Sequence, residues 1–219
     1  MIRAVISDFG GVLTTPLSGA LTAYGESSGI SPEQIGTAME RLARAHGRHP
    51  LFELEKGAIS ERRYVEMLEA ELGRSVDSQA FSGVLMDNLH RNEAMIDLVR
   101  DLRRRGLRTA LLTNNVREWE PLWRAKLPDI DELFEVIVDS AFVGMRKPEP
   151  EIYRLTLERL GGGLEAHECV FVDDLEINCK AAGALGMHAV RFVDSEQAIE
   201  AIEAAVRERE VDGDTDSSA

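Results

Sequence analysis

Residues 4–12 read AVISDFGGV, a short apolar run that ends at Asp8 and is followed by a pair of glycines. The run is too apolar to lie at a surface, so we predict a buried strand over residues 2–7. Asp8 would then stand at the carboxyl end of that strand. In an open α/β sheet this edge is where ligands bind, which makes Asp8 a candidate for chemistry.

Two later strings repeat this arrangement. LLTNN ends an apolar run at Thr113 and Asn114, and VFVDD ends another at Asp173 and Asp174. We interpret each run as a buried strand, so these polar side chains also follow strand ends. Because the carboxyl ends of parallel strands meet at one edge of a sheet, we expect these residues to lie close to Asp8.

The acidic residues in these strings favour a divalent cation. Asp8, Asp173 and Asp174 would repel one another at a shared edge unless a cation lay among them. Magnesium prefers a few carboxylates together with water and phosphate oxygens. The sequence therefore predicts a Mg²⁺ site built on these carboxylates.

A hydroxyl and a lysine complete a site for a phosphate group. Thr113 and Asn114 offer a hydroxyl and backbone N–H groups at a strand end. In the string GMRKPEP, Lys147 precedes Pro148, and a second proline two residues later stiffens the same loop. A carboxylate such as Asp8 can attack phosphorus to give an aspartyl-phosphate, provided that cations offset the repulsion between the two anions. We expect Lys147 to supply part of that positive charge.

The rest of the chain predicts a parallel sheet interrupted by a helical insertion. Strand and helix patterns alternate five times outside the insertion, which is typical of parallel α/β folds. The expected strands are residues 2–7, 109–113, 136–138, 170–172 and 188–192, and the expected helices are residues 93–105, 117–126, 149–160, 176–185 and 195–209. Inside the insertion the signals are helical: Ser31 followed by Pro32 begins one helix, and Ser60 begins another.

These patterns give a domain division. We predict an α/β fold, with a Rossmann-like doubly wound parallel sheet core formed by residues 1–15 and 89–210. Residues 16–88 are predicted to be an inserted α-helical cap. Residues 211–219 are acidic and polar without an apolar anchor, and we expect them to be a disordered tail.

The composition is ordinary for a soluble globular protein, with 44% hydrophobic and 29% charged residues. The formal net charge of −14 disfavours nucleic acid as a partner, because such binding relies on Lys and Arg. No apolar run is long enough to cross a bilayer, and the N-terminus enters a strand without a signal-peptide layout. We therefore expect a cytoplasmic protein with no membrane partner, and expect Cys169 and Cys179 to be reduced core residues.

Taken together, the four strings resemble the motifs of the haloacid dehalogenase-like (HAD) hydrolase superfamily. The likeness covers nearly the whole chain and lies with the phosphatase-like branch, subfamily IA, whose C1-type helical cap is inserted after the first motif. It implies that Asp8 is the nucleophile, and that Thr113 and Lys147 hold the transferring phosphoryl group. It also implies Mg²⁺-dependent hydrolysis of a small phosphorylated metabolite, a sugar phosphate being one candidate, by a monomer or a homodimer.

The resemblance further assigns the metal ligands. It implies that Asp8, Asp174 and the backbone carbonyl of Gly10 bind Mg²⁺, with Asp173 close by. One departure stands out at Gly10, because phosphatases of this superfamily usually carry a second aspartate two residues after the nucleophile. Loss of a positioned general acid and base forfeits about 10²- to 10⁴-fold in rate.

Three explanations of this departure stay open. The substrate can have a good leaving group, as in an anomeric sugar phosphate or an acyl phosphate, with Asp173 or a cap residue activating water. The chain can be a 2-haloacid dehalogenase in which Asp8 attacks carbon, although that branch has serines and an asparagine where this chain has Asp173 and Asp174. It can also be an inactive relative that binds a phosphate ligand or a protein partner.

Two further groups of residues have a plain and a functional interpretation. Trp119 and Trp123 are expected to pack in the core, with a dimer face as the alternative. Basic cap residues are expected to form a solvated helix end, with contact to the substrate as the alternative. These residues are Arg41, Arg44, His46, Arg48 and His49.

Overall fold

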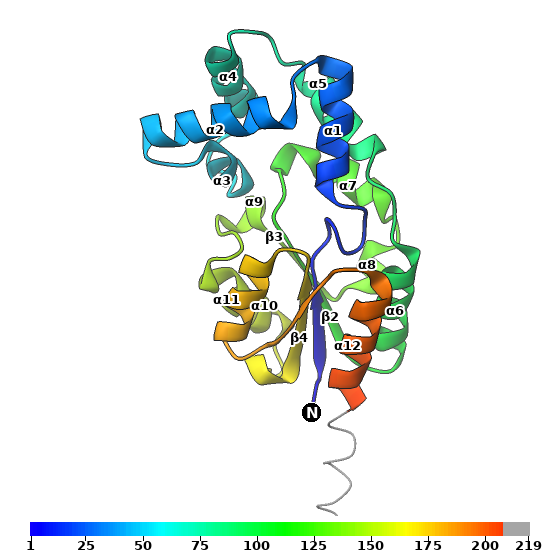
Figure 1. Cartoon of the computed structure of the whole chain (residues 1–219). Helices are drawn as coiled ribbons and strands as arrows, with labels where there is room; N and C mark the ends of the chain where they lie inside the picture. Colours follow the sequence, from blue (N-terminus) through cyan, green and yellow to red (C-terminus); the bar gives the residue numbers. More distant parts are fainter. Residues whose placement is uncertain (208–219) are drawn as a thin grey trace, which may run out of the picture.

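The structure, a computed structural model, describes residues 1–207 (Figure 1). The predicted acidic tail, residues 211–219, lies outside the described residues, as do the last two residues of the helix expected over 195–209. Among the described residues, no helix combines the length and the apolar character that a membrane crossing requires.

Within residues 1–207, five parallel strands form one sheet in the order β3-β2-β1-β4-β5. The strands are β1 (Ala4–Ser7), β2 (Arg108–Thr113), β3 (Val136–Asp139), β4 (Cys169–Asp173) and β5 (His188–Arg191). The strand that carries the first motif, β1, lies at the centre between β2 and β4. The prediction of a Rossmann-like doubly wound α/β fold is confirmed.

Helices cover both faces of this sheet (Figure 1). One face packs against α6 (Glu93–Arg104) and α12 (Ser195–Arg207), and the other against α10 (Pro150–Leu160) and α11 (Glu176–Ala184). Side chains of a strand alternate between the faces, so Leu111 joins the first layer and Leu112 the second. Because both faces are buried, the central strands are apolar throughout, as the sequence indicated.

The chain between β1 and α6 is helical throughout its regular structure. Its helices are α1 (Leu17–Ser28), α2 (Pro32–His46), α3 (Pro50–Glu55), α4 (Glu61–Leu72) and α5 (Ser78–Asp87). They lie beyond the carboxyl edge of the sheet in Figure 1. The predicted helix starts are confirmed: Ser31 caps α2 and the side chain of Ser60 accepts a hydrogen bond from Arg63 N.

The two segments that join these helices to the sheet run side by side. Thr14 bridges to Arg91, and Thr15 N donates to His90 O at 2.8 Å. Next to this pair, the backbone N–H of Asn92 donates to Leu13 O at 2.8 Å. This paired neck supports our proposal that the cap is residues 16–88 and that the core resumes at residue 89.

Several elements were too short for a sequence period to indicate. They are α3, α8 (Ile130–Leu133), α9 (Ser140–Val143) and the 3-10 turn η2 (Ala166–Glu168). The helix expected over 117–126 is divided into a 3-10 turn, η1 (Arg117–Trp119), and α7 (Glu120–Lys126).

The tryptophans and cysteines lie in the interior. Trp119 and Trp123 are both buried in the chain's own core, and Trp123 packs on Phe9 with ring centroids 5.3 Å apart. Cys169 and Cys179 are buried and unpaired, as expected for reduced core residues. The core interpretation of all four side chains is confirmed.

Substitution of a central leucine tests this packing. Leu111 is fully buried in β2, so we predict that Leu111→Ala lowers the free energy of unfolding by about 2–5 kcal/mol. Leu122 on α7 is 40% exposed, and Leu122→Ala is expected to cost no more than about 0.5 kcal/mol. Urea denaturation measures both, and equal losses in the two variants would contradict the assigned packing.

Candidate active site

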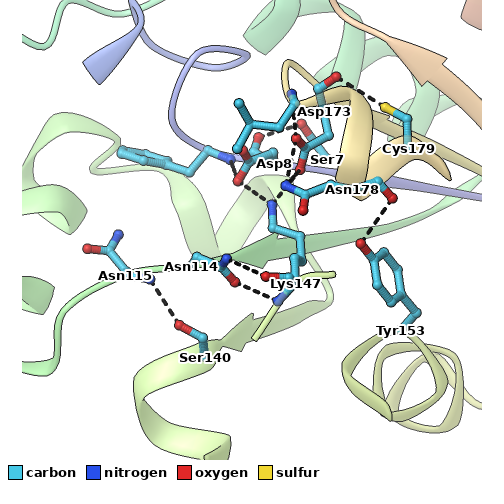
Figure 2. Close-up of polar contacts among 12 residues, drawn as sticks. Ser7, Asp8, Asn114, Asn115, Ser140, Lys147, Tyr153, Asp173, Asn178 and Cys179 are labelled. Carbon is cyan, nitrogen blue, oxygen red and sulfur yellow. Dashed lines mark hydrogen bonds and ion pairs between the residues drawn. The ribbon is translucent and has the colours of Figure 1, made fainter. Parts of the chain in front are cut away.

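The buried ammonium group of Lys147 is the centre of the site. Its Nζ lies 2.7 Å from Asp8 Oδ1 and 2.6 Å from Asp173 Oδ2, and its side chain is 1% exposed (Figure 2). Asp8 follows β1 and Asp173 ends β4, while Lys147 comes from the loop after α9. The structure thus brings two carboxylates predicted at one sheet edge together with the lysine that was expected to offset their charge.

The backbone of Lys147 is held by the residue that follows β2. Lys147 N donates to Asn114 Oδ1 at 2.8 Å, and Asn114 Nδ2 donates back to Lys147 O at 3.0 Å (Figure 2). The side-chain amide of Asn114 is therefore engaged with the protein. For the phosphate contact predicted for Asn114, only its backbone N–H then remains. Thr113, directly before it, is buried at the end of β2.

Asp173 is completely buried and surrounded by donors. Leu175 N donates to its Oδ1 at 2.9 Å, and Asn178 Nδ2 lies 2.9 Å from Oδ1 and 3.1 Å from Oδ2. Tyr153 holds the first turn of α11, which carries Asn178, since its hydroxyl donates to Asn178 O at 3.0 Å. These contacts suit a residue that orients Lys147 better than one that activates water.

Asp8 keeps one carboxylate oxygen available. Its Oδ1 accepts the backbone N–H of Phe9 at 2.7 Å besides the Lys147 ammonium, whereas no residue in the described chain donates to Oδ2. Burial raises the pKa of Asp8 to about 7, against the opposing charge of Lys147. Burial works to lower the pKa of Lys147, but the charges of Asp8 and Asp173 outweigh it and the pKa is raised.

The three acidic residues of the first and fourth motifs fit a hard cation. Asp8, Asp173 and Asp174 each offer a carboxylate oxygen, and these oxygens lie within 4.8 Å of one another. Burial, followed by the charge of Asp173, raises the pKa of Asp174. Such a set of oxygen donors is what Mg²⁺ prefers.

The two glycines after Asp8 have different physical roles. Gly11 has φ = 82°, and a Cβ there would collide with the carboxylate of Asp174, so only glycine lets Asp174 approach. In the sequence, Gly11 is simply one of the two glycines after Asp8, and no local pattern indicates this role. A Cβ on Gly10 would meet nothing within 4 Å, so packing does not require glycine at that position.

The three arginines among the basic cap residues pair within the cap. Arg41 binds Glu71, Arg44 binds Glu40 and Arg48 binds Glu53. All three arginine side chains are exposed, which favours the solvated-face interpretation. One cap residue that does reach the lysine loop is Glu55, whose Oε2 lies 2.6 Å from Arg146 Nε. No pattern in the sequence indicates this contact.

Asp139 is a further buried carboxylate at this edge. Its Oδ1 accepts the backbone N–H of Ala141 at 2.9 Å, while Oδ2 has no hydrogen-bond partner among residues 1–207. Burial raises the pKa of Asp139 to about 6. The folded state therefore binds this proton more tightly than the unfolded chain, and stability falls as pH rises through the window between the two pKa values.

We predict that Asp139→Asn removes this dependence. The amide keeps an acceptor for Ala141 N and carries no charge, so the variant should exceed the wild type by about 3 kcal/mol in unfolding free energy at about pH 7. At about pH 4 the advantage should shrink to a small fraction of that. Urea denaturation at both pH values measures it, and an advantage of equal size at both would show that ionisation is not the cause.

Comparison with known proteins places this geometry in a family. The family model described as haloacid dehalogenase-like hydrolase matches residues 2–186. A mouse protein, acyl-CoA dehydrogenase family member 10, is 32% identical over 92% of this chain, which spans 19% of that protein's length. A sesquiterpene phosphatase of Aspergillus oryzae is 28% identical over 88% of this chain and 91% of its own length.

A solved structure shares the architecture. A HAD family enzyme from Bacteroides thetaiotaomicron, in complex with magnesium and inorganic phosphate, is 25% identical with a TM-score of 0.69. The match covers 87% of this chain and 94% of that one. The sheet order, the strand-end carboxylates and the family match agree, and this chain is a haloacid dehalogenase-like hydrolase.

Proposed function

We propose that this hydrolase removes the phosphoryl group from a small phosphomonoester, with Asp8 as nucleophile and Mg²⁺ as cofactor. The observation that carries the proposal is the ammonium of Lys147 bound by Asp8 and Asp173, with Asp174 in reach of the same point. When all three carboxylates are ionised, they and the one ammonium leave a deficit of two positive charges. A divalent cation satisfies that deficit, and a phosphate group brings further oxygen ligands.

The residues that would hold the metal are Asp8, Asp174 and the backbone carbonyl of Gly10. When bound, Mg²⁺ acts as a Lewis acid that lowers the charge repulsion between the phosphate and Asp8.

The chain's own residues account for binding and attack. Lys147 has three N–H donors and uses two on Asp8 and Asp173, so the third is free for a phosphate oxygen. The hydroxyl of Thr113 and the backbone of Asn114 bind the other oxygens. Asp8 Oδ2 forms a bond to phosphorus while the bond to the leaving oxygen breaks. Water then attacks phosphorus, which releases phosphate and restores the carboxylate.

Gly10 shapes the range of substrates. Without a carboxylic acid at this position, the leaving oxygen departs unprotonated by that group, which favours esters with good leaving groups. Anomeric sugar phosphates and acyl phosphates meet this condition. The phosphatase among the relatives and the phosphate complex of the solved HAD enzyme support phosphoryl transfer. A dehalogenase would gain nothing from Asp174, whose charge would repel a haloacid.

The nucleophile is tested by Asp8→Asn. We predict that Mg²⁺-dependent hydrolysis of p-nitrophenyl phosphate falls by about 10³-fold or more, because an amide cannot attack phosphorus. Chelation of the metal by EDTA should abolish turnover in the wild type. Asp87→Asn, which changes an exposed cap carboxylate, should leave the rate unchanged.

Three results would contradict the proposal. They are undiminished turnover in Asp8→Asn, metal-independent halide release from 2-chloropropionate, and a thermal shift with phosphate but no hydrolysis of any phosphate ester. The second would indicate a dehalogenase and the third a protein that only binds.

The role of Gly10 is tested by adding the absent acid. The open space around Gly10 accommodates a side chain, so Gly10→Asp should raise kcat for glycerol phosphate, a poor leaving group, by at least about tenfold. The gain for p-nitrophenyl phosphate should be smaller. Gly36→Asp on α2 adds the same charge in open space away from the site and serves as control. Equal changes for both esters would rule out general-acid catalysis by the new side chain.

A further inference from the structure

One contact between the cap and the core is made by three consecutive residues, Glu55, Lys56 and Gly57, at the C-terminal end of α3. Glu55 Oε2 lies 2.6 Å from Arg146 Nε, and Lys56 forms an ion pair with Glu149. Gly57 comes next with φ = 65°, and a Cβ there would collide with the carbonyl oxygen of Ala141 in α9. Figure 1 shows α3 beside α9 at this contact.

The two ion pairs bind the first and the last residue of the turn that carries Lys147. Glu149 N donates to Arg146 O at 2.8 Å, and Arg146 N donates to Glu149 Oε2 at 3.2 Å, which closes a turn with Lys147 and Pro148 at its centre. On the cap, the acidic Glu55 is followed by the basic Lys56. On the turn, the basic Arg146 comes before the acidic Glu149. A displaced cap would bring like charges together, so the pairs fix one register of docking.

The pair between Glu55 and Arg146 is more buried than ion pairs elsewhere on the cap. The two side chains are 14% and 15% exposed, and the ring of Phe52 stacks on the Arg146 guanidinium at 3.9 Å. In contrast, Arg48, which binds Glu53 on the same helix, is 75% exposed. Exposed pairs contribute little, whereas removing one partner of a desolvated pair leaves the other charge poorly compensated.

The turn is therefore held from two sides. From the core, Asn114 binds the backbone N and O of Lys147. From the cap, Glu55 and Lys56 bind the residues on either side of the Lys147–Pro148 dipeptide. Glu55 itself touches neither Asp8 nor Asp173.

We infer that Glu55 is a positioning residue, which acts through Arg146 to hold Lys147 between the two carboxylates whenever the cap is docked. Cap docking and the placement of the phosphate-binding lysine are then a single event. The inference rests on the proposed function in one respect, namely that Lys147 binds the phosphoryl group.

Amide hydrogen exchange tests the inference without turnover. In Glu55→Ala, the amides of the turn at residues 146–149 should exchange at least about tenfold faster than in the wild type, because Arg146 loses its anchor. Glu53→Ala, on the same helix but paired within the cap, should leave this turn unchanged. Unchanged exchange in Glu55→Ala would overturn the inference.

A double-mutant cycle tests whether Glu55 acts through Arg146. With p-nitrophenyl phosphate and Mg²⁺, Glu55→Ala should lower kcat/KM about tenfold, whereas the same change added to Arg146→Gln should cost less than about twofold more. Equal losses in both backgrounds would show that Glu55 does not act through Arg146, and would overturn the inference.

Two measures keep the outcomes distinct. Glu55→Gln, which retains the shape and a hydrogen-bond acceptor, replaces the alanine variant if thermal unfolding shows that the latter does not fold. If the wild type hydrolyses no phosphate ester, the proposed function fails, while the exchange comparison still decides whether Glu55 anchors the lysine turn.

Discussion

The ammonium of Lys147, enclosed by Asp8 and Asp173, is the interaction on which the site depends. A lysine with 1% exposure is costly unless its charge is paired and its donors are bound. Removing the lysine would leave two buried carboxylates at one sheet edge with no cation between them. The same contact keeps two carboxylates of one sheet edge from repelling each other, and leaves Oδ2 of Asp8 and one lysine donor for a substrate.

The surroundings of this triad serve to fix its geometry. Asn114 binds the lysine backbone, Asn178 binds Asp173, and Tyr153 anchors the turn of Asn178. Because each of these contacts is a hydrogen bond to a group that cannot reach water, each tolerates little displacement. The cap adds Glu55, so the geometry of the site is completed by a segment that folds outside the sheet.

Much of the core and the identity of the central residues could be predicted from the sequence, because both follow local rules. Apolar runs that end in polar residues indicated the strand ends at Asp8, Thr113 and Asp173. Helix-capping residues such as Ser31 indicated the helices of the cap. The contact between Glu55 and Arg146 could not be predicted, since no local pattern links residues so distant in the chain. Likewise, the sequence does not show that position 11 requires glycine while position 10 does not. That difference follows from the backbone angle and the neighbours of Gly11.

A crystal structure with Mg²⁺ and inorganic phosphate tests the central claim most directly. The account predicts one ion bound by Asp8, Asp174 and the Gly10 carbonyl, and a phosphate oxygen on the third donor of Lys147, whose contacts with Asp8 and Asp173 persist. A phosphate bound elsewhere, or Lys147 turned away from both carboxylates in the complex, would contradict it.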